Sequence, residues 1–310
     1  MTKKIFLLFI LIIVLTKVSA QEKFSVTEIS VNPILNGSLY LPEKDGKNLV
    51  IVIAGSGPTD RNGNQIGVKN NSLKLLAEGL AKQNISVFTF DKRIIAEMKN
   101  GNFSEGELTL DSMIVDVERI ISHFEKTKKF KKIILAGHSE GSLIGMNAAK
   151  NSVDGFVSIA GAGRTLDKIL VEQIGNRMPA LKAETAKNLQ LLKEGKPIEK
   201  VNPILASIFR PSVQNYMRSL LLHDPQKEIE QLKIPILIIN GTKDMQIPET
   251  DAKLLHQATP QSELVIIENM NHVLKEIKNG EEENMASYAN GDLPVMPQLI
   301  ESVANFVKKI

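Results

Sequence analysis

Six short apolar runs alternate along the chain with longer segments whose apolar residues recur at helical spacing. The runs cover residues 49–54, 85–90, 132–136, 155–160, 235–240 and 263–267. Helical spacing is found in residues 72–83, 108–129, 143–150 and 299–309. Continuously apolar strands separated by helices are typical of a parallel sheet that is buried on both faces. The pattern therefore predicts an α/β fold, with a mostly parallel central sheet and helices on both of its faces.

Three segments depart from this alternation. Before the first run, residues 26–31 and 38–41 are suited to antiparallel edge strands, and Asn36-Gly37 between them predicts a hairpin turn. Residues 164–232 lack buried-strand runs and are expected to form a helical cap inserted over the edge of the sheet. Residues 275–298 are polar and are expected to form a loop. No internal repeat or linker is visible, so residues 21–310 are expected to form one domain.

The N-terminus has the pattern of a secretory signal peptide. Lys3 and Lys4 precede an unbroken apolar run over residues 5–15, and Val18-Ser19-Ala20 supplies small residues before a cut at Gln21. The alternative is an uncleaved membrane anchor, but the run is shorter than the roughly 20 residues that span a bilayer. We expect residues 1–20 to be removed and the protein to be exported, periplasmic or secreted, with no stable membrane anchor after cleavage.

Charge and composition exclude several classes of function. Loss of residues 1–20 removes three lysines and no acid, which leaves 35 basic and 35 acidic residues. This balance does not indicate a nucleic-acid partner. The chain has no cysteine, which excludes disulfides, thiolate nucleophiles, cysteine-based zinc sites and a lipid anchor on cysteine. The five histidines are scattered, so neither a metal nor an organic cofactor is expected.

The sequence Gly137-His138-Ser139-Glu140-Gly141 joins a buried-strand pattern directly to a helical one. A G-x-S-x-G motif in this context is typical of a nucleophile elbow, in which a tight turn raises the serine hydroxyl above the sheet. The glycines are needed because side chains there would collide with neighbouring backbone. Ser139 is therefore the predicted nucleophile, against the alternative that these residues form only a glycine-rich packing turn.

A nucleophilic serine needs a histidine base and an acid that orients the histidine. In this type of fold the acid follows the serine along the chain, and the histidine follows the acid. Asp244 follows the fifth apolar run and His272 follows the sixth, so both are expected at the edge of the sheet that carries Ser139. Asp251 is the rival acid. The other histidines are placed in a helix, in the elbow or in the cap: His123, His138, His223 and His256.

Two backbone N–H groups are expected to form an oxyanion hole beside Ser139. One belongs to Glu140, the residue after the nucleophile, and the other to Ser56 in the loop after the first apolar run. Gly55 and Gly57 flank Ser56 and let its backbone approach a substrate. A phosphate-binding reading of this loop is disfavoured, because the loop lacks the spacing and the lysine of a P-loop.

Several motifs together make the chain resemble the α/β-hydrolases, in particular bacterial exported esterase and serine-aminopeptidase-like members. The matching segments are residues 55–64, 91–93, 137–141, 241–248 and 271–275. The resemblance implies a Ser139-Asp244-His272 triad, an oxyanion hole at Ser56 and Glu140, and an Asp60–Arg61 ion pair that supports the loop, with recognition of a substrate carboxylate by Arg61 as an alternative. The chain departs from the family at Ile94-Ile95-Ala96-Glu97, where relatives have a glycine-rich turn.

The leading functional hypothesis is a serine esterase that acts on small or medium acyl esters through an acyl-enzyme. A peptidase that releases an N-terminal residue or dipeptide would use the same triad, but it needs an anion for the substrate amine, for which Glu140 and Glu172 are candidates. An acyltransferase and a non-catalytic binding protein on the same scaffold are further alternatives. The expected partner is a small ester or short peptide, and the oligomeric state stays open.

Overall fold

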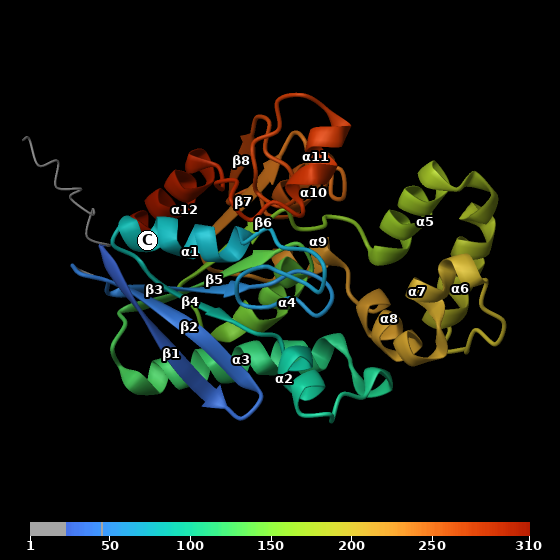
Figure 1. Ribbon diagram of the computed structural model, residues 1–310, viewed down its shortest axis with the longest axis horizontal. Coiled ribbons are helices and arrows are strands. Elements are labelled where there is room, and N and C mark those ends of the chain that lie inside the picture. Colours follow the sequence, from blue (N-terminus) through green and yellow to red (C-terminus); the bar gives the residue numbers. More distant parts are fainter. Residues whose placement is uncertain (1–22, 45) are drawn as a thin grey trace, which may run out of the picture.

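The computed structural model describes residues 23–44 and 46–310, and within them eight strands form one sheet (Figure 1). The strand order is β1-β2-β4-β3-β5-β6-β7-β8. The first two strands are antiparallel to their neighbours, and the ladder is parallel from β4 through β8. The prediction of a mostly parallel sheet is therefore confirmed. The strands are β1 (Phe24–Asn32), β2 (Leu35–Pro42), β3 (Asn48–Ile53), β4 (Ser86–Phe90), β5 (Lys132–His138), β6 (Gly155–Ile159), β7 (Ile236–Gly241) and β8 (Glu263–Ile267).

Helices cover both faces of the sheet, as the alternation of the sequence predicts (Figure 1). Helices α1 (Ser72–Lys82) and α12 (Pro297–Lys309) share one hydrophobic core with Val50 and Val52 of β3. Helices α3 (Leu110–Thr127), α4 (Glu140–Ala148) and α10 (Glu249–Ala258) share the other with Ile51 and Ile53. Successive side chains of a strand point to opposite faces, so continuously apolar strands supply both cores.

The hairpin turn between the two edge strands is not where the sequence predicts it. The turn is formed by Pro33-Ile34, and Asn36 and Gly37 lie inside β2, paired with Ser30 and Ile29. Gly37 also pairs with Phe90, and a Cβ built on it would lie 2.3 Å from the Thr89 carbonyl oxygen. The glycine therefore allows β2 to approach β4, and it marks a close contact between strands rather than a turn.

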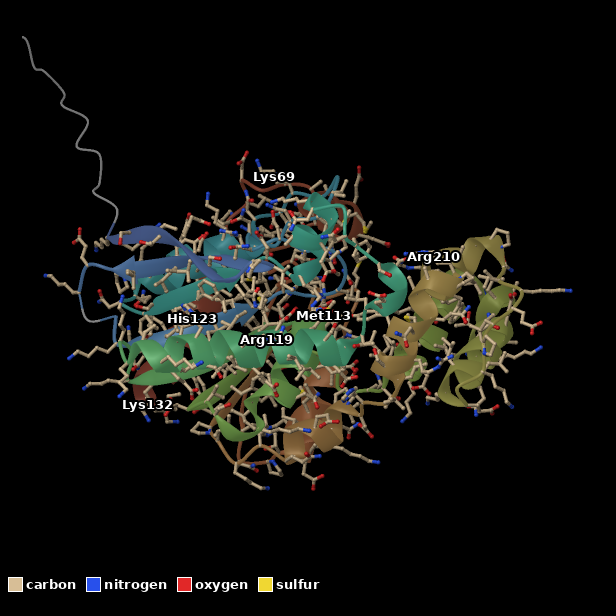
Figure 2. The ribbon with its side chains drawn as sticks, turned by 90° about the horizontal axis from the view of Figure 1, so that it is seen from below. Lys69, Met113, Arg119, His123, Lys132 and Arg210 are labelled. Atoms are coloured by element: carbon tan, nitrogen blue, oxygen red, sulfur yellow. The ribbon has the colours of Figure 1, made fainter. Side chains whose placement is uncertain are left out.

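The expected helical insertion is present and divides into two parts. Helices α5 (Leu166–Arg177), α6 (Lys182–Lys193), α7 (Ala206–Phe209) and α8 (Gln214–Leu221) project away from the sheet (Figures 1 and 2). We call these four helices the cap. Helix α9 (Pro225–Glu230) instead returns to the main body, where it packs on α4 and α10. Buried cap side chains such as Leu192, Phe209 and Leu220 belong to the same core cluster as α3 and α4.

Two helices occupy segments for which no helix is predicted. Residues 281–287, within the expected polar loop, form α11 (Glu281–Ser287), which has three glutamates in its first turn. Negative charge at this position favours a helix N-terminus. The segment that departs from the family pattern at Ile94 forms α2 (Arg93–Lys99), whose Arg93 binds both carboxylate oxygens of Asp116. The predicted signal peptide lies outside the described residues, and none of the helices within them is long and apolar enough to cross a membrane.

Candidate active site

Ser139 lies at the turn between β5 and α4, with φ 55° and ψ −122°. A non-glycine residue at positive φ outside the left-handed helical region is strained and is held by its surroundings. The Ser139 N–H donates to the Ile159 carbonyl at 2.9 Å. Cβ atoms built on Gly137 and Gly141 would lie 2.2 and 2.3 Å from backbone oxygens, so both positions require glycine. The two glycines of the motif therefore permit the tight turn that the sequence predicts.

The structure brings Ser139, His272 and Asp244 into one chain of hydrogen bonds. His272 Nε2 lies 3.1 Å from Ser139 Oγ, and His272 Nδ1 lies 2.8 Å from Asp244 Oδ2. The other Asp244 oxygen accepts from the backbone N–H groups of Gln246 and Ile247 at 2.8 and 2.9 Å. With Asp244 ionised, Nδ1 carries the proton donated to it and Nε2 is left to accept from the serine hydroxyl.

Asp251, the rival acid, has a different place in the molecule. It is fully buried, and it accepts from the backbone N–H groups of Gly163 and Arg164 and from the Arg164 guanidinium. These contacts fix the start of the chain segment that leads into the cap. Asp251 therefore has a structural role, and it lies in the first turn of α10.

The four remaining histidines do not replace His272 in this chain of hydrogen bonds. His138 lies within 2.8 Å of the His272 carbonyl oxygen, and burial together with the neighbouring His272 lowers the pKa of His138 to about 4. It is therefore neutral at physiological pH, and its hydrogen bond is with the backbone of His272 rather than with Ser139 Oγ. His223 and His256 bond to Glu228 and Ser262 respectively, and His123 lies on α3 with its ring against Phe124.

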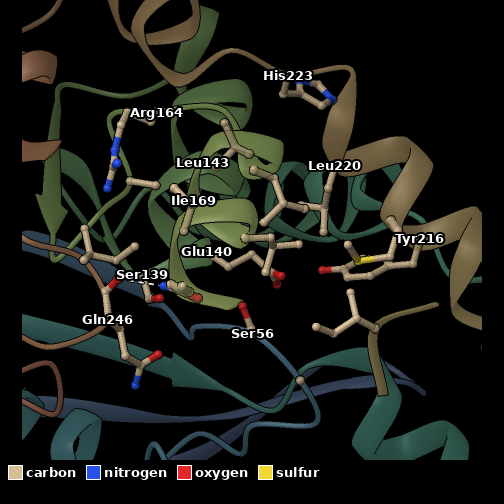
Figure 3. Close-up of a pocket in the computed structure, with 18 of the residues that line it drawn as sticks. Ser56, Ser139, Glu140, Leu143, Arg164, Ile169, Tyr216, Leu220, His223 and Gln246 are labelled. Carbon is tan, nitrogen blue, oxygen red and sulfur yellow. Dashed lines mark hydrogen bonds between the residues drawn. The ribbon is translucent and has the colours of Figure 1, made fainter. Parts of the chain in front are cut away.

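The two segments expected to form the oxyanion hole are tied together by a residue to which sequence reasoning gave no role. Lys92 Nζ donates at 2.9 Å to the Gly55 carbonyl and at 2.9 Å to Glu140 Oε1. The Lys92 and Glu140 side chains are only 4% and 7% exposed. Burial opposes ionisation of Glu140, but the charge and hydrogen bond of Lys92 outweigh it, and the pKa of Glu140 is lowered. The Tyr216 hydroxyl of the cap points toward the same carboxylate (Figure 3).

Asp60 and Arg61 support the loop after β3, but they do not pair with each other as the resemblance implies. Arg61 donates from its backbone and guanidinium to Asp91, at 2.9 and 2.7 Å, and it also pairs with Glu28. Asp60 accepts from the backbone N–H groups of Asn62 and Asn64. The Asp60 carboxylate thus closes its own turn, and the Arg61 guanidinium reaches Glu28 of β1 and Asp91, the residue after β4.

A cavity of about 340 Å³ lies between Ser139 and the cap (Figure 3). We call it the cap cavity. Its walls are mainly aliphatic, and they are formed by α4, by the cap helices and by loop residues such as Ile247. The apolar lining residues are Leu143, Ala162, Leu166, Ile169, Leu170, Ile208, Val213, Met217, Leu220, Pro225 and Ile247. Ser56 and Glu140, the two residues expected at the oxyanion hole, lie at the Ser139 end of this space.

A second cavity, of about 420 Å³, also borders Ser139. We call it the loop cavity, because loops of the main body form it and no cap helix contributes. Most of its side chains carry neutral hydroxyl, amide or imidazole groups, and they belong to Ser56, Thr59, Gln65, Asn70, Ser72, His138, Gln246, His272 and Tyr288. Among residues 23–44 and 46–310, no group of three or more histidines or acids is placed to hold a metal ion.

Comparison with known proteins places the chain in a family. The model of the family described as serine aminopeptidase S33 matches residues 69–276, about two thirds of the chain. The chain belongs to this S33 family. The S33 match begins just before α1 and includes the whole cap, together with Ser139, Asp244 and His272.

Two curated relatives of this S33 chain are similar over much of its length. Esterase EstD of Thermotoga maritima is 26% identical over 269 residues, which cover 82% of this chain and 61% of EstD. The AB hydrolase superfamily protein YisY of Bacillus subtilis is 28% identical over 181 residues, 52% of this chain and 66% of YisY. The aligned parts thus span less than two thirds of each relative's own length.

Solved structures establish the α/β-hydrolase fold for this S33 chain. Est1E from Butyrivibrio proteoclasticus superposes with a TM-score of 0.54 at 17% identity, over 90% of this chain and 99% of Est1E. The Pyrococcus furiosus esterase Pf2001 gives 0.56 at 15% identity, over 92% and 91% of the two chains. At such low identity the likeness shows the fold alone.

Proposed function

We propose that this protein is a serine hydrolase that cleaves carboxylic esters through an acyl-enzyme. The observation that carries the proposal is the hydrogen-bonded chain from Ser139 through His272 to Asp244 at the strained turn after β5. Ser139 Oγ would attack the ester carbonyl carbon while His272 Nε2 takes the hydroxyl proton. His272 would then give this proton to the leaving alcohol, and water would release the acyl group by the reverse sequence.

The backbone N–H groups of Ser56 and Glu140 are the proposed oxyanion hole. They flank Ser139, and Glu140 begins α4, whose N-terminal dipole favours developing negative charge. The apolar walls of the cap cavity favour a short or medium acyl chain at this site, because a pocket of this size buries a small apolar group.

The geometry favours an ester over a peptide with a free N-terminus, which the name of the S33 family would suggest. A peptidase of that kind needs an unpaired anion for the substrate amine. Both candidate acids are already paired: Glu140 with Lys92 at 2.9 Å, and Glu172 with Arg164 at 2.6 Å. An ammonium group entering the cap cavity would meet a neutralised carboxylate. The similarity to EstD, which is named as an esterase, also supports an ester substrate.

The experiment that tests this function compares p-nitrophenyl esters of increasing acyl length with aminoacyl p-nitroanilides. We expect the esters to be hydrolysed with a far higher kcat/KM than the anilides. Preferred turnover of the anilides would instead support the peptidase. If neither series is hydrolysed and a fluorophosphonate does not label the protein, the non-catalytic alternative would replace the proposal. Faster transfer to an added alcohol than to water would indicate an acyltransferase.

Narrowing the cap cavity is expected to shift the acyl preference. Leu170 lines this cavity and is partly buried, so Leu170→Trp would fill space that a longer chain occupies. We expect kcat/KM for octanoyl esters to fall by roughly 10- to 100-fold while acetyl esters are affected much less, since one lost methylene contact is worth about 1–3 kcal/mol. Leu222→Trp, at a position 73% exposed and outside the cavity, is the matched control. An equal loss for all acyl lengths would contradict the assignment.

We also propose that the protein is exported, on the strength of the signal-peptide pattern in residues 1–20. N-terminal sequencing of the protein recovered from cells is expected to begin at Gln21. A chain that keeps its first twenty residues would count against export by this route.

A further inference from the structure

The two cavities meet at Ser139 and differ in chemistry. Ser56, Gly57, Ser139 and Gln246 line both of them. His272 lines only the loop cavity. A substrate whose carbonyl lies at Ser139 can therefore extend in two directions, and only one of these passes His272.

The position of His272 decides which part of an ester takes which direction. When the tetrahedral intermediate collapses, the bond between the carbonyl carbon and the alcohol oxygen breaks, and His272 Nε2 protonates that oxygen. The alcohol must therefore leave on the His272 side, and the acyl group stays bonded to Ser139 Oγ. This places the alcohol in the loop cavity and the acyl group in the cap cavity.

We infer that the substrates are esters in which an apolar acyl group is joined to a neutral polyhydroxy alcohol of the glycerol or sugar type. This inference rests on the proposed esterase function. Its support is the set of hydroxyl and amide side chains around the loop cavity, among which no Lys, Arg, Asp or Glu is found within the described residues. The two histidines that line the loop cavity are the buried His138 and His272, which is occupied with proton transfer. A charged alcohol therefore finds no counterion in the lining of this cavity.

Tyr288 is the side chain best placed to recognise a substrate hydroxyl. Its hydroxyl oxygen accepts from Gln246 Nε2 at 3.1 Å, so its own proton is available for donation. Burial raises the pKa of Tyr288, so the phenol keeps that proton across the physiological range. Thr59 and Asn70, in the segment between β3 and α1, supply further neutral polar groups to the lining.

The test holds the acyl group constant and varies the alcohol. Octanoyl esters of glycerol, glucose, ethanol, choline and glycerol phosphate are compared by kcat/KM. We expect the glycerol or glucose ester to exceed the ethyl ester by about tenfold or more, and the choline and glycerol phosphate esters to be the poorest. Equal values for the neutral esters, or preference for a charged one, would overturn the inference while leaving the esterase function intact. Absence of all ester hydrolysis would instead reject the function itself.

A variant separates hydroxyl recognition from general effects on catalysis. Tyr288→Phe is expected to lower the ratio of polyol to ethyl ester kcat/KM by roughly three- to tenfold, as expected for loss of one neutral hydrogen bond. Tyr40→Phe is the matched control, because Tyr40 lies on β2 beside Phe24 and lines neither cavity. A ratio unchanged by Tyr288→Phe would remove Tyr288 from alcohol recognition.

Lys92 contacts both segments of the proposed oxyanion hole. Its ammonium donates to the carbonyl of Gly55, and that carbonyl belongs to the same peptide unit as the Ser56 N–H. In a trans peptide the C=O and N–H point in opposite directions, and no cis bond is found in the described chain. A hydrogen bond that fixes the Gly55 carbonyl thus fixes the direction of the Ser56 N–H.

We propose that Lys92 is a positioning residue that keeps both oxyanion-hole N–H groups directed at the same substrate oxygen. Its second hydrogen bond goes to the Glu140 side chain, and the backbone N–H of Glu140 is the other proposed donor. One buried ammonium therefore connects the two segments that must act on the same oxygen. The positive charge also polarises the Gly55–Ser56 peptide, which strengthens the N–H as a donor to an oxyanion.

Lys92→Met removes the ammonium with little change in length. We expect kcat to fall by roughly 10- to 100-fold, less than for complete loss of a donor, with KM changed far less. Affinity for an octyl boronic acid, which mimics the tetrahedral intermediate, should fall by a similar factor. Unchanged kcat and inhibitor affinity in a folded Lys92→Met protein would overturn the proposal.

A double variant excludes a merely structural role, because Lys92→Met alone leaves Glu140 buried without its partner. Lys92→Met with Glu140→Gln removes both charges and is expected to recover the Tm. We expect kcat to stay low in the double variant, since the Gly55 carbonyl is still released. Glu140→Gln alone keeps the Lys92–Gly55 bond and should lose less kcat than Lys92→Met. Recovery of kcat together with Tm would show that Lys92 only stabilises the fold.

Discussion

Replacement of Ser139 by alanine is expected to lower kcat for p-nitrophenyl esters by about 10⁵- to 10⁶-fold. The hydroxyl is the group that forms the covalent bond, and the neighbouring His272 cannot substitute for it. Only the residual rate provided by binding and the oxyanion hole should remain. Steady-state assays with purified protein measure this loss, and circular dichroism checks that the variant is folded.

Ser302→Ala serves as the control for Ser139→Ala. Ser302 is partly buried on α12, where its hydroxyl donates to the Gln298 carbonyl, and it lines neither cavity. Its activity should match that of the unsubstituted protein. Substantial esterase activity in Ser139→Ala would mean that another nucleophile acts, and the proposed mechanism would have to be abandoned.

Replacement of Asp244 by asparagine has the second-largest expected effect. The carboxylate holds the His272 Nδ1 proton at 2.8 Å, so the amide would favour the wrong tautomer and leave Nε2 unable to accept the serine proton. We expect kcat to fall by about 10³- to 10⁴-fold near neutral pH with little change in KM. The hydrogen bonds from Gln246 and Ile247 go to the other oxygen and can be kept by the amide oxygen.

Asp251→Asn distinguishes the two acids that the sequence alone left as rivals. Asp251 is fully buried and paired with Arg164, so its replacement should lower the Tm through loss of a buried charge partner. We expect its kcat to remain far closer to that of the unsubstituted protein than in Asp244→Asn. The reverse order of the two kcat values would reassign the acid to Asp251.

The sheet could be predicted from sequence because its parallel strands are buried on both faces and read as unbroken apolar runs. The edge hairpin could not be placed in the same way. Asn36-Gly37 has the composition of a turn, but Gly37 is required by the close approach of β4, a contact that depends on residues fifty positions away in sequence. Helix α2 could not be predicted, because residues 94–97 differ from the glycine-rich turn of relatives without indicating what structure replaces it.

The parts of the candidate site that depend on local sequence motifs could be predicted. The elbow is coded by adjacent residues, and Asp244 and His272 each follow a strand, so position along the chain indicates their place at the sheet edge. The partners of Arg61 and the role of Lys92 depend on side chains that meet across β4, the loop after β3 and α4. No spacing along the chain encodes those contacts. The difference between the two cavities likewise appears only when cap and loops are folded together.

Covalent labelling with a fluorophosphonate, followed by mass mapping of the modified peptide, tests the central claim most directly. The reagent reacts with a serine only when a base has activated it. The account predicts one stoichiometric adduct on Ser139, absent from Ser139→Ala and strongly slowed in Asp244→Asn. An adduct on another serine, or no adduct on a folded protein that hydrolyses esters, would contradict it.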